Sequence, residues 1–231
     1  MQKIEPLEHS QYYHIYNCGI NGEPVFREPR NYEHFLRLYE KYIDPVAETF
    51  AWCLMGNHFH FLARIKEAEK IGCYVPLNSD RSSDAVRFKT YVQHDLSASV
   101  GPDRVSNKIN EKTPNISKHF SHLFNAYARY FNTRYKRHGS LFERPFKRKL
   151  IDNETYLKQV VIYIHNNPVH HGFCNHPVEY AWSSYLTCIS LKPTKIKRPD
   201  VLDWFGSKTQ FETDHKEAGN RVNEVESFLN L

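Results

Sequence analysis

Two histidines separated by one residue are the first candidates for chemistry in this sequence. His58 and His60 lie in a β-prone run, residues 58–65. Side chains alternate between the two faces of a strand, so both imidazoles project from one face about 7 Å apart, while Phe59 and Phe61 point into the core. Neutral imidazole nitrogens bind divalent metals. The spacing is consistent with a metal site, and also with two surface or hydrogen-bonded histidines.

A tyrosine and an asparagine are the second candidates. Residues 153–166 have the spacing of a helix whose apolar stripe faces a sheet, formed by Leu157, Val160, Val161 and Ile164. Tyr163 lies about 110° from the centre of that stripe, and Asn167 follows one turn later on the same flank. A hydroxyl nucleophile and an amide ligand would then stand side by side. Amphipathic packing, as for Tyr156, is the alternative.

The surrounding pattern predicts the elements that position these residues. A strand over 11–18 precedes a turn at Asn21-Gly22, and a helix capped by Asn31 ends before Pro45. A hairpin of two strands, 49–55 and 58–65, comes next. A helix over 116–135 closed by Gly139, a strand over 146–151 and the helix over 153–166, which we expect to stop at Pro168, complete the order.

This order, β, α, β, β, α, β, α, predicts an α+β fold. The arrangement is a ferredoxin-like split βαβ antiparallel sheet with helices on one face, an extra helix that carries Tyr163, and a small helical tail. The helix over 116–135 carries a stripe for the core, formed by Ile116, Phe120, Leu123, Tyr127 and Phe131.

The chain divides by composition into a main domain, residues 1–190, and a C-terminal helical appendage, residues 191–231. The main domain contains a polar insertion over about 66–114, in which residues 85–96 could form a short helix. The appendage has enough apolar residues, among them Trp204 and Phe211, for one or two small helices that pack on the main body.

Bulk composition indicates a folded, water-soluble chain. Hydrophobic residues make up 40% of the sequence and the mean hydropathy is −0.65, with no long apolar run, which argues against membrane spans. The N-terminal residues show no signal-peptide pattern, so we expect a cytoplasmic protein. Five cysteines without a Cys-x-x-Cys pair predict neither a disulfide framework nor a zinc ribbon.

Positive charge is concentrated in one aromatic-rich stretch, residues 127–149. It holds eight Lys and Arg residues against one acid, Glu143, whereas the rest of the chain holds 23 basic and 25 acidic residues. Such a stretch suits a polyanion whose bases can stack, which predicts a nucleic-acid partner; a solvated basic surface is the alternative. The expected contacts with the nucleic-acid backbone are Arg129, Arg134, Arg137, Arg144 and Lys147.

Five segments in order make the sequence similar to a known family. They are residues 13–19 (YHIYNCG), 54–60 (LMGNHFH), 139–147 (GSLFERPFK), 163–169 (YIHNNPV) and 182–185 (WSSY). Together they resemble the REP-associated tyrosine transposases, which belong to the single-tyrosine branch of the HUH endonuclease superfamily. The resemblance covers about residues 10–186.

The resemblance implies a DNA-cleaving and joining enzyme. His58 and His60 would bind Mg²⁺ or Mn²⁺, Asn167 would complete the metal site, and Tyr163 would attack a phosphodiester of single-stranded or hairpin DNA. The products are a 5'-phosphotyrosine and a free 3'-hydroxyl, and the covalent bond conserves energy for rejoining. The family also implies a first-strand histidine near the site, here His14, which is a further candidate contact with DNA. A histidine that hydrogen-bonds locally on its strand is the alternative. The family further implies a monomer or a homodimer that associates with the nucleoid through DNA.

Two features of the sequence depart from the family's pattern, and three other functions are alternatives to the transposase. Cys18 stands where relatives often carry Arg, and His170-His171 replaces the usual Arg-Ala. One alternative is a protein that grips DNA or RNA hairpins without cutting. A ferredoxin-like RNA-binding domain would instead display aromatic residues on an open sheet face, and a zinc hydrolase would need a Glu or Asp near the histidine pair.

Overall fold

The computed structural model describes residues 5–71 and 115–218, with one antiparallel sheet of four strands at the centre. The strands are β1 (Tyr12–Cys18), β2 (Ala47–Leu54), β3 (His58–Ile65) and β4 (Lys147–Ile151), in the spatial order β2-β3-β1-β4. This order is that of the split βαβ sheet, so the predicted fold class is confirmed. The short α2 (Ala68–Ile71) follows β3, and the helix predicted over 85–96 lies outside the described residues.

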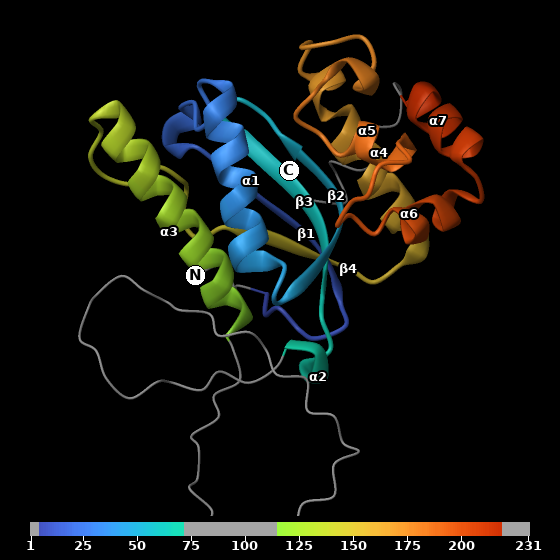
Figure 1. The fold of residues 1–231 in the computed structure, drawn as a ribbon, viewed down its shortest axis with the longest axis horizontal. Helices are drawn as coiled ribbons and strands as arrows, with labels where there is room; N and C mark the ends of the chain where they lie inside the picture. The colour runs from blue at the N-terminus through green and yellow to red at the C-terminus, as the bar shows by residue number, and fades with distance from the viewer. Residues whose placement is uncertain (1–4, 72–114, 219–231) are drawn as a thin grey trace, which may run out of the picture.

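Two helices, α1 (Pro29–Ile43) and α3 (Ile116–Tyr135), cover one face of the sheet (Figure 1). The core between them and the sheet is rich in aromatic rings: Phe61 stacks on Tyr39 at 4.2 Å between ring centroids, and Phe59 lies 5.2 Å from Phe35. All five residues of the predicted α3 stripe are buried. Phe59 and Phe61 therefore point to the helix-covered side, as their spacing predicts.

The opposite face is covered by α4 (Glu154–His170) and by three C-terminal helices, α5 (Tyr185–Ile189), α6 (Arg198–Phe205) and α7 (Lys208–Glu217). These helices share a second buried cluster with the sheet, which includes Leu62, Val161, Ile164, Phe205 and Phe211. Figure 1 shows the sheet between the two groups of helices. The sheet is thus enclosed on both faces, whereas helices were expected on one face only. The second face is covered by the extra helix and the tail, and also by α5, which belongs to the predicted main domain.

The outer edge of β2 is closed by backbone hydrogen bonds from the C-terminal part of the chain. The amide of Leu54 donates to the carbonyl of Trp182, and the amides of Ser184 and Lys197 donate to Trp52 and Thr49, all at 2.9 Å. An open edge would present these groups to other chains. The segment after α4, which includes the turn η2 (Pro177–Glu179), is therefore fastened to the sheet as well as to α4.

The N-cap of α1, the C-cap of α3 and the C-terminal end of α4 differ from the predictions. Glu28, not Asn31, is the N-cap of α1; Asn31 is the third helical residue, and its side chain accepts from the Glu28 amide in a capping box. Helix α3 ends at Tyr135, four residues before Gly139, because Lys136 and not Gly139 adopts the left-handed conformation that closes it, with φ 51°. A turn at Asn21-Gly22 is present as predicted, within η1 (Ile20–Gly22).

Helix α4 does not stop at Pro168 but continues to His170. Proline removes one N–H and disfavours helical backbone at the residue before it, which costs about 3 kcal/mol in a helix interior. The burial of every residue from Tyr163 to Pro168 offsets this cost. The backbone after the proline is also satisfied, since the amides of His171 and Phe173 donate to the carbonyls of Asn167 and Pro168.

Among the residues that the structure describes, no helix has both the length and the hydrophobicity to cross a membrane. Four of the five cysteines fall within the described residues, and all four are free thiols: Cys18, Cys53, Cys174 and Cys188.

Candidate active site

The β1–β3 pairing brings three histidines together on the face that α4 covers. His60 pairs with Tyr16 and His58 with Cys18, so His14 lies two residues along β1 from the partner of His60. The Nε2 atom of His14 is 2.9 Å from Nδ1 of His60, and the two rings are stacked at 5.0 Å with 10° between their planes. The predicted orientation of His58 and His60 toward one face is confirmed.

Helix α4 places Tyr163 and Asn167 over these histidines. The Tyr163 ring lies edge-on to His60 and His14, at centroid distances of 5.4 and 6.0 Å. Oδ1 of Asn167 is 2.9 Å from Nε2 of His58. Residues more than 100 positions apart in the sequence thus meet in one cluster.

The spacing predicts Tyr163 beside the apolar stripe of α4, but Tyr163 is only 5% exposed. The sheet and the C-terminal helices bury every residue of α4 from Tyr163 to Pro168, on this flank as well as on the stripe. Burial in this part of the helix is therefore wider than the apolar stripe predicts. The comparator Tyr156 is only partly buried, so these two tyrosines are distinguished by position along the helix rather than by the stripe.

Burial keeps the histidines of this cluster neutral. His14 is completely buried, and desolvation lowers its pKa to about 3. Desolvation, followed by repulsion from His14, holds the pKa of His60 well below its ordinary value. Burial also lowers the pKa of His58, with the hydrogen bond to Asn167 acting in the opposite direction. Neutral imidazoles offer the lone pairs that a metal ligand needs.

The contacts of His58 fit a cation between its Nε2 atom and Asn167. Nδ1 of His58 lies 2.7 Å from Oδ1 of Asn57, and Nε2 lies 2.9 Å from Oδ1 of Asn167. A neutral ring has one N–H, so it can donate to only one of these oxygens. Either the amide of Asn57 or Asn167 is turned over, or a cation lies between the remaining lone pair and Oδ1 of Asn167. Two ligands at right angles around Mg²⁺, each about 2.1 Å away, lie about 3.0 Å apart, which fits the second arrangement.

A site made only of charged or imidazole ligands is not present. Within residues 5–71 and 115–218, no group of three or more His, Cys, Asp or Glu side chains is placed to hold a metal. The candidate ligand set is therefore two imidazoles and the amide oxygen of Asn167.

Two residues of the site were missed by the sequence analysis. Tyr16 is partly buried, and its ring stacks on His14 at 4.8 Å and on His60 at 5.8 Å. The alternation of β1 places Tyr16 on the same face as His14, which is the signal that could have identified it. His171, exposed at the end of α4, has its ring 5.1 Å from that of His58. No spacing rule predicts that contact, because it depends on α4 continuing past Pro168.

The predicted nucleic-acid contacts are not gathered at the cluster. Arg134 and Arg137 pair with Glu28 and Glu23, so part of the charge of the basic stretch is balanced by acids from another segment. Lys147 comes closest to the site: its Nζ lies 5.8 Å from the centre of the Tyr16 ring.

The other residues expected to contact nucleic acid differ in their exposure. Arg129 and Arg144 are exposed. His14 has no exposed surface and contacts His60 instead, so its side chain cannot reach a strand of DNA in this conformation.

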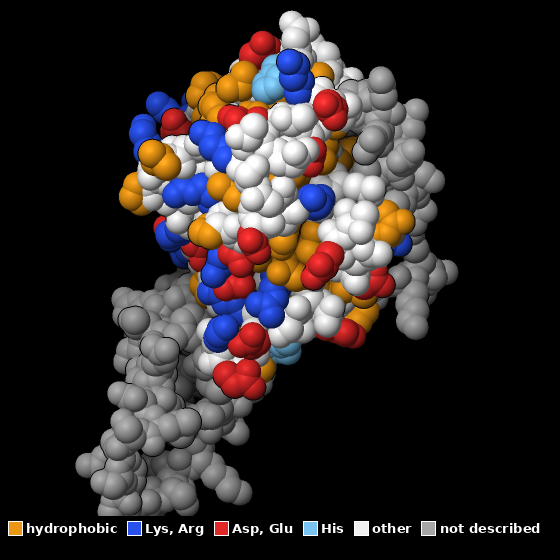
Figure 2. Space-filling view, turned by 90° about the vertical axis from the view of Figure 1, so that its right-hand side faces the viewer, with side chains coloured by type: hydrophobic (Ala, Val, Ile, Leu, Met, Phe, Trp, Pro, Cys, Tyr) orange, Lys and Arg blue, Asp and Glu red, His pale blue; other side chains and the backbone are white. Residues whose placement is uncertain are grey.

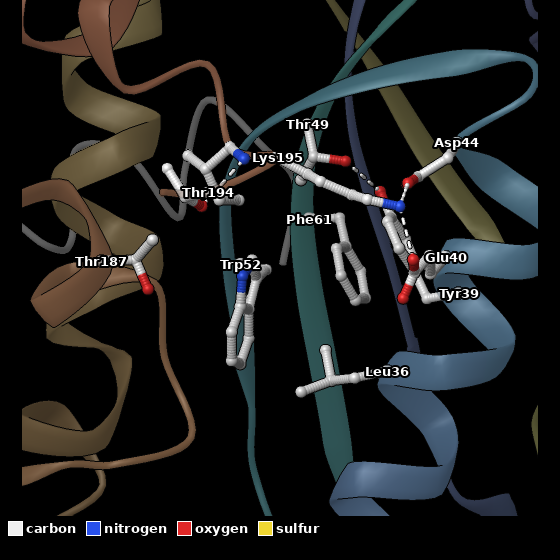
Figure 3. A pocket seen from close by; sticks show the side chains of 11 residues that line it. Leu36, Tyr39, Glu40, Asp44, Thr49, Trp52, Phe61, Thr187, Thr194 and Lys195 are labelled. Carbon is white, nitrogen blue, oxygen red and sulfur yellow. Dashed lines mark hydrogen bonds and ion pairs between the residues drawn. The ribbon is translucent and has the colours of Figure 1, made fainter. Parts of the chain in front are cut away.

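A crevice elsewhere on the molecule does not belong to this cluster. It lies between α1 and the segment around Lys195, with Trp52 and Phe61 on its wall (Figure 3). Phe61 faces away from His58 and His60, so the sheet separates the crevice from the histidines. Lys195 reaches across to Glu40 and Asp44. The face shown in Figure 2 mixes basic, acidic and apolar side chains and has no single-sign field.

Comparison with known proteins gives one structural likeness. No family model matches the sequence, and a search of curated proteins finds no match. Among solved structures, the chain is similar to a REP-associated tyrosine transposase bound to a REP hairpin, with a TM-score of 0.47 and 13% sequence identity. The alignment covers 84% of this chain and 88% of the other.

Proposed function

We propose that this chain cleaves and rejoins single-stranded DNA through a covalent link to Tyr163. The observation that carries the proposal is the convergence of Tyr163 and Asn167 from α4 with His58 and His60 from β3. The sequence motifs that contain these residues resemble those of single-tyrosine transposases. The geometry supplies the second argument, because the motifs meet in space.

The proposed reaction exchanges one phosphodiester bond for another. The hydroxyl oxygen of Tyr163 attacks the phosphorus of the scissile linkage and loses its proton. A bond forms between that oxygen and phosphorus while the bond from phosphorus to the 3'-oxygen breaks, and the 3'-oxygen leaves as a hydroxyl after gaining a proton. Attack by this hydroxyl on the phosphotyrosine reverses the exchange, so joining needs no external energy source.

The ligand set suits Mg²⁺ or Mn²⁺. His58, His60 and Asn167 would hold the ion, which when bound would polarise the scissile phosphate and stabilise its developing charge. His14 contributes through His60: a ligating histidine usually donates its second N–H to a neighbouring group, and Nε2 of His14 is the acceptor at 2.9 Å. That assignment puts the other hydrogen of His14 on Nδ1, a buried atom with no hydrogen-bond partner among the described residues.

We propose hairpin DNA as the substrate form, because the motifs resemble a family that acts on such hairpins. Lys147 and Tyr16 lie beside the histidines, where a cation and an aromatic ring can contact a strand that enters the site. Arg144 is exposed two residues after the buried Phe142 and is the next candidate contact. Arg134 and Arg137 are engaged by Glu28 and Glu23. Lys147 has a longer ion pair, 3.6 Å from its Nζ to Oε2 of Glu143, which it would exchange for a phosphate.

A gel assay with matched tyrosine variants tests the proposal. The protein, Tyr163→Phe and Tyr16→Phe are each incubated with labelled hairpin oligonucleotides and Mn²⁺, and products are separated under denaturing conditions. We expect a covalent protein–DNA band with the unmodified chain and with Tyr16→Phe, but not with Tyr163→Phe. Cleavage that survives in Tyr163→Phe would point to hydrolysis by water instead.

A hairpin-binding protein that does not cut is the second candidate. The observation in its favour is the burial of Tyr163, which leaves 5% of the side chain exposed. Binding without any covalent band, over a set of hairpins and with either Mg²⁺ or Mn²⁺, would establish this alternative. An RNA-binding sheet of the open-faced kind is disfavoured, because α4 covers the face that would have to be free.

A further inference from the structure

A buried chain of hydrogen bonds joins α4 to α7 and to strand β2. His165 has no exposed surface; its Nε2 is 2.7 Å from Oγ of Ser184, and its Nδ1 is 2.9 Å from Nε2 of His215 on α7. Nδ1 of His215 is 2.7 Å from the carbonyl of Phe211. Oγ of Ser184 accepts from the amide of Trp52 on β2 at 2.8 Å. The chain thus links α7, α4 and β2.

The direction of the bonds follows from two carbonyls, which can only accept. The Ser184 hydroxyl has one hydrogen and lies closer to Nε2 of His165 (2.7 Å) than to the Trp52 carbonyl (3.3 Å), so it donates to the imidazole. The Phe211 carbonyl accepts, so Nδ1 of His215 donates and, in a neutral ring, its Nε2 carries a lone pair. Nδ1 of His165 then donates to that lone pair, and Nε2 of His165 accepts from the hydroxyl of Ser184. Burial lowers the pKa of both histidines, which agrees with neutral rings. Every nitrogen of the pair is satisfied by a single set of tautomers.

The anchored segment of α4 is the one that bears the proposed site. His165 lies between Tyr163 and Asn167 in the sequence, and the side-chain amide of Asn166 donates to the backbone carbonyl of His215 at 3.1 Å. Pro168 gives no N–H to the helix, so this segment has fewer internal bonds than an uninterrupted helix. Its position therefore depends on the partners that hold it from outside.

We propose that Ser184, His165 and His215 are positioning residues, which fix the last turns of α4 so that Tyr163 and Asn167 meet His58 and His60. The hydrogen bonds carry this inference because they are directional. Apolar contacts alone would permit α4 to rotate or slide against α7. A chain in which each donor is paired with an acceptor forms in one position of α4 only. The activity readout of this proposal rests on the proposed function, but the positioning itself does not.

Three variants separate positioning from stability. His215→Leu removes both bonds of the ring; His215→Gln can restore them, since its oxygen can accept from His165 and its amide can donate to Phe211. Val201→Ala, in the same buried cluster but with no part in the chain, is the control for lost packing. Ser184→Ala is a second disruptive variant, available if His215→Leu does not fold.

The primary readout is the ¹⁵N chemical shifts of the assigned His58 and His60 rings, which report their surroundings whether or not the protein cuts DNA. We expect these shifts to change in His215→Leu and Ser184→Ala, to return in His215→Gln and to stay unchanged in Val201→Ala. Shifts that stay unchanged in folded His215→Leu, or that move equally in Val201→Ala, would overturn the positioning role.

Metal and DNA measurements extend the test. We expect the Mn²⁺ affinity and the single-turnover cleavage rate of His215→Leu to fall about tenfold, as for other groups that orient metal ligands, with unchanged hairpin affinity. If the unmodified protein does not cleave, the proposed function fails, while the ring shifts still decide the positioning role.

Discussion

At His58, two amide oxygens face a ring that has one N–H to give. A cation between Nε2 of His58 and Oδ1 of Asn167 resolves this mismatch, and so does a turned amide at Asn57 or Asn167. At His165 there is no such mismatch, because both ring nitrogens are satisfied by protein groups. Histidine burial alone does not distinguish a metal ligand from a structural residue, so a metal titration is the test that separates the two.

The first prediction concerns metal affinity. His58→Ala and His60→Ala should each weaken Mn²⁺ binding by about tenfold or more, because each removes one of three proposed ligands. Isothermal titration of the folded variants measures this change. His122→Ala, which alters an exposed histidine on α3, is the matched control. Equal affinities in His58→Ala and the unmodified chain would exclude His58 from the site.

At the scale of elements, α4 is the helix that decides whether the site exists. Its start is fixed by Asn153, whose side chain accepts from the Thr155 amide at 2.8 Å. The sequence predicted this cap and the apolar stripe, since both follow from local rules. It did not predict the continuation past Pro168, because local preference at proline favours a stop. Tertiary burial from the sheet and the tail reverses that preference.

We predict that Asn153→Ala destabilises the protein by about 1 kcal/mol, through the loss of the N-cap of α4. Urea unfolding at pH 7 measures the free energy of unfolding. Asn153→Ser, which keeps a capping oxygen, should lose less. If both variants lose the same amount, the cap is not the cause.

A pH prediction follows from the α4–α7 contact. Burial lowers the pKa of His215 to about 4, against an ordinary value of 6.5. Between pH 4 and pH 6.5 the His215 ring therefore binds a proton in the unfolded chain but not in the folded one. Stability is therefore complete above pH 6.5 and falls as the pH decreases toward 4. The contribution of His215 at pH 5 is about 2 kcal/mol less than at pH 7. His165, His176 and Asp214 are the titratable groups that surround it.

Urea unfolding at pH 7 and pH 5 measures this loss. The His215→Gln variant should show a shallower dependence on pH than the unmodified chain, and His122→Gln should not differ from it. A dependence that is the same in all three proteins would contradict the assignment to His215.

For the whole molecule, the split βαβ sheet with α1 and α3 on one face follows from element order and alternation, and it was predicted. The cover on the second face was not, because the expectation was helices on one face only. The long-range contacts were not: the closure of the β2 edge by residues 182–197 and the pairing of Glu23 and Glu28 with basic side chains connect segments that no local pattern relates. The basic stretch accordingly contributes less free charge than its composition suggests. The division of the chain at residue 190 stays a prediction.

We therefore predict unequal effects of the arginines on DNA affinity. Arg144→Ala should weaken hairpin binding and reduce its salt dependence, since a phosphate contact releases counterions. Arg134→Ala should have a smaller effect, because Arg134 must leave Glu28 to bind a phosphate. Binding titrations at several salt concentrations compare the two. A larger loss in Arg134→Ala would show that Arg134 leaves Glu28 when DNA binds.

The residue that becomes linked to DNA can be identified in the covalent product formed with hairpin DNA and Mn²⁺. The product is treated with nuclease and trypsin, and the nucleotide-bearing peptide is sequenced by mass spectrometry. We expect a modified peptide over 159–195, with the phosphate on Tyr163, because the bond between Lys192 and Pro193 resists trypsin. A modified peptide over 4–27, which contains Tyr16, or the absence of any modified tyrosine would contradict this expectation.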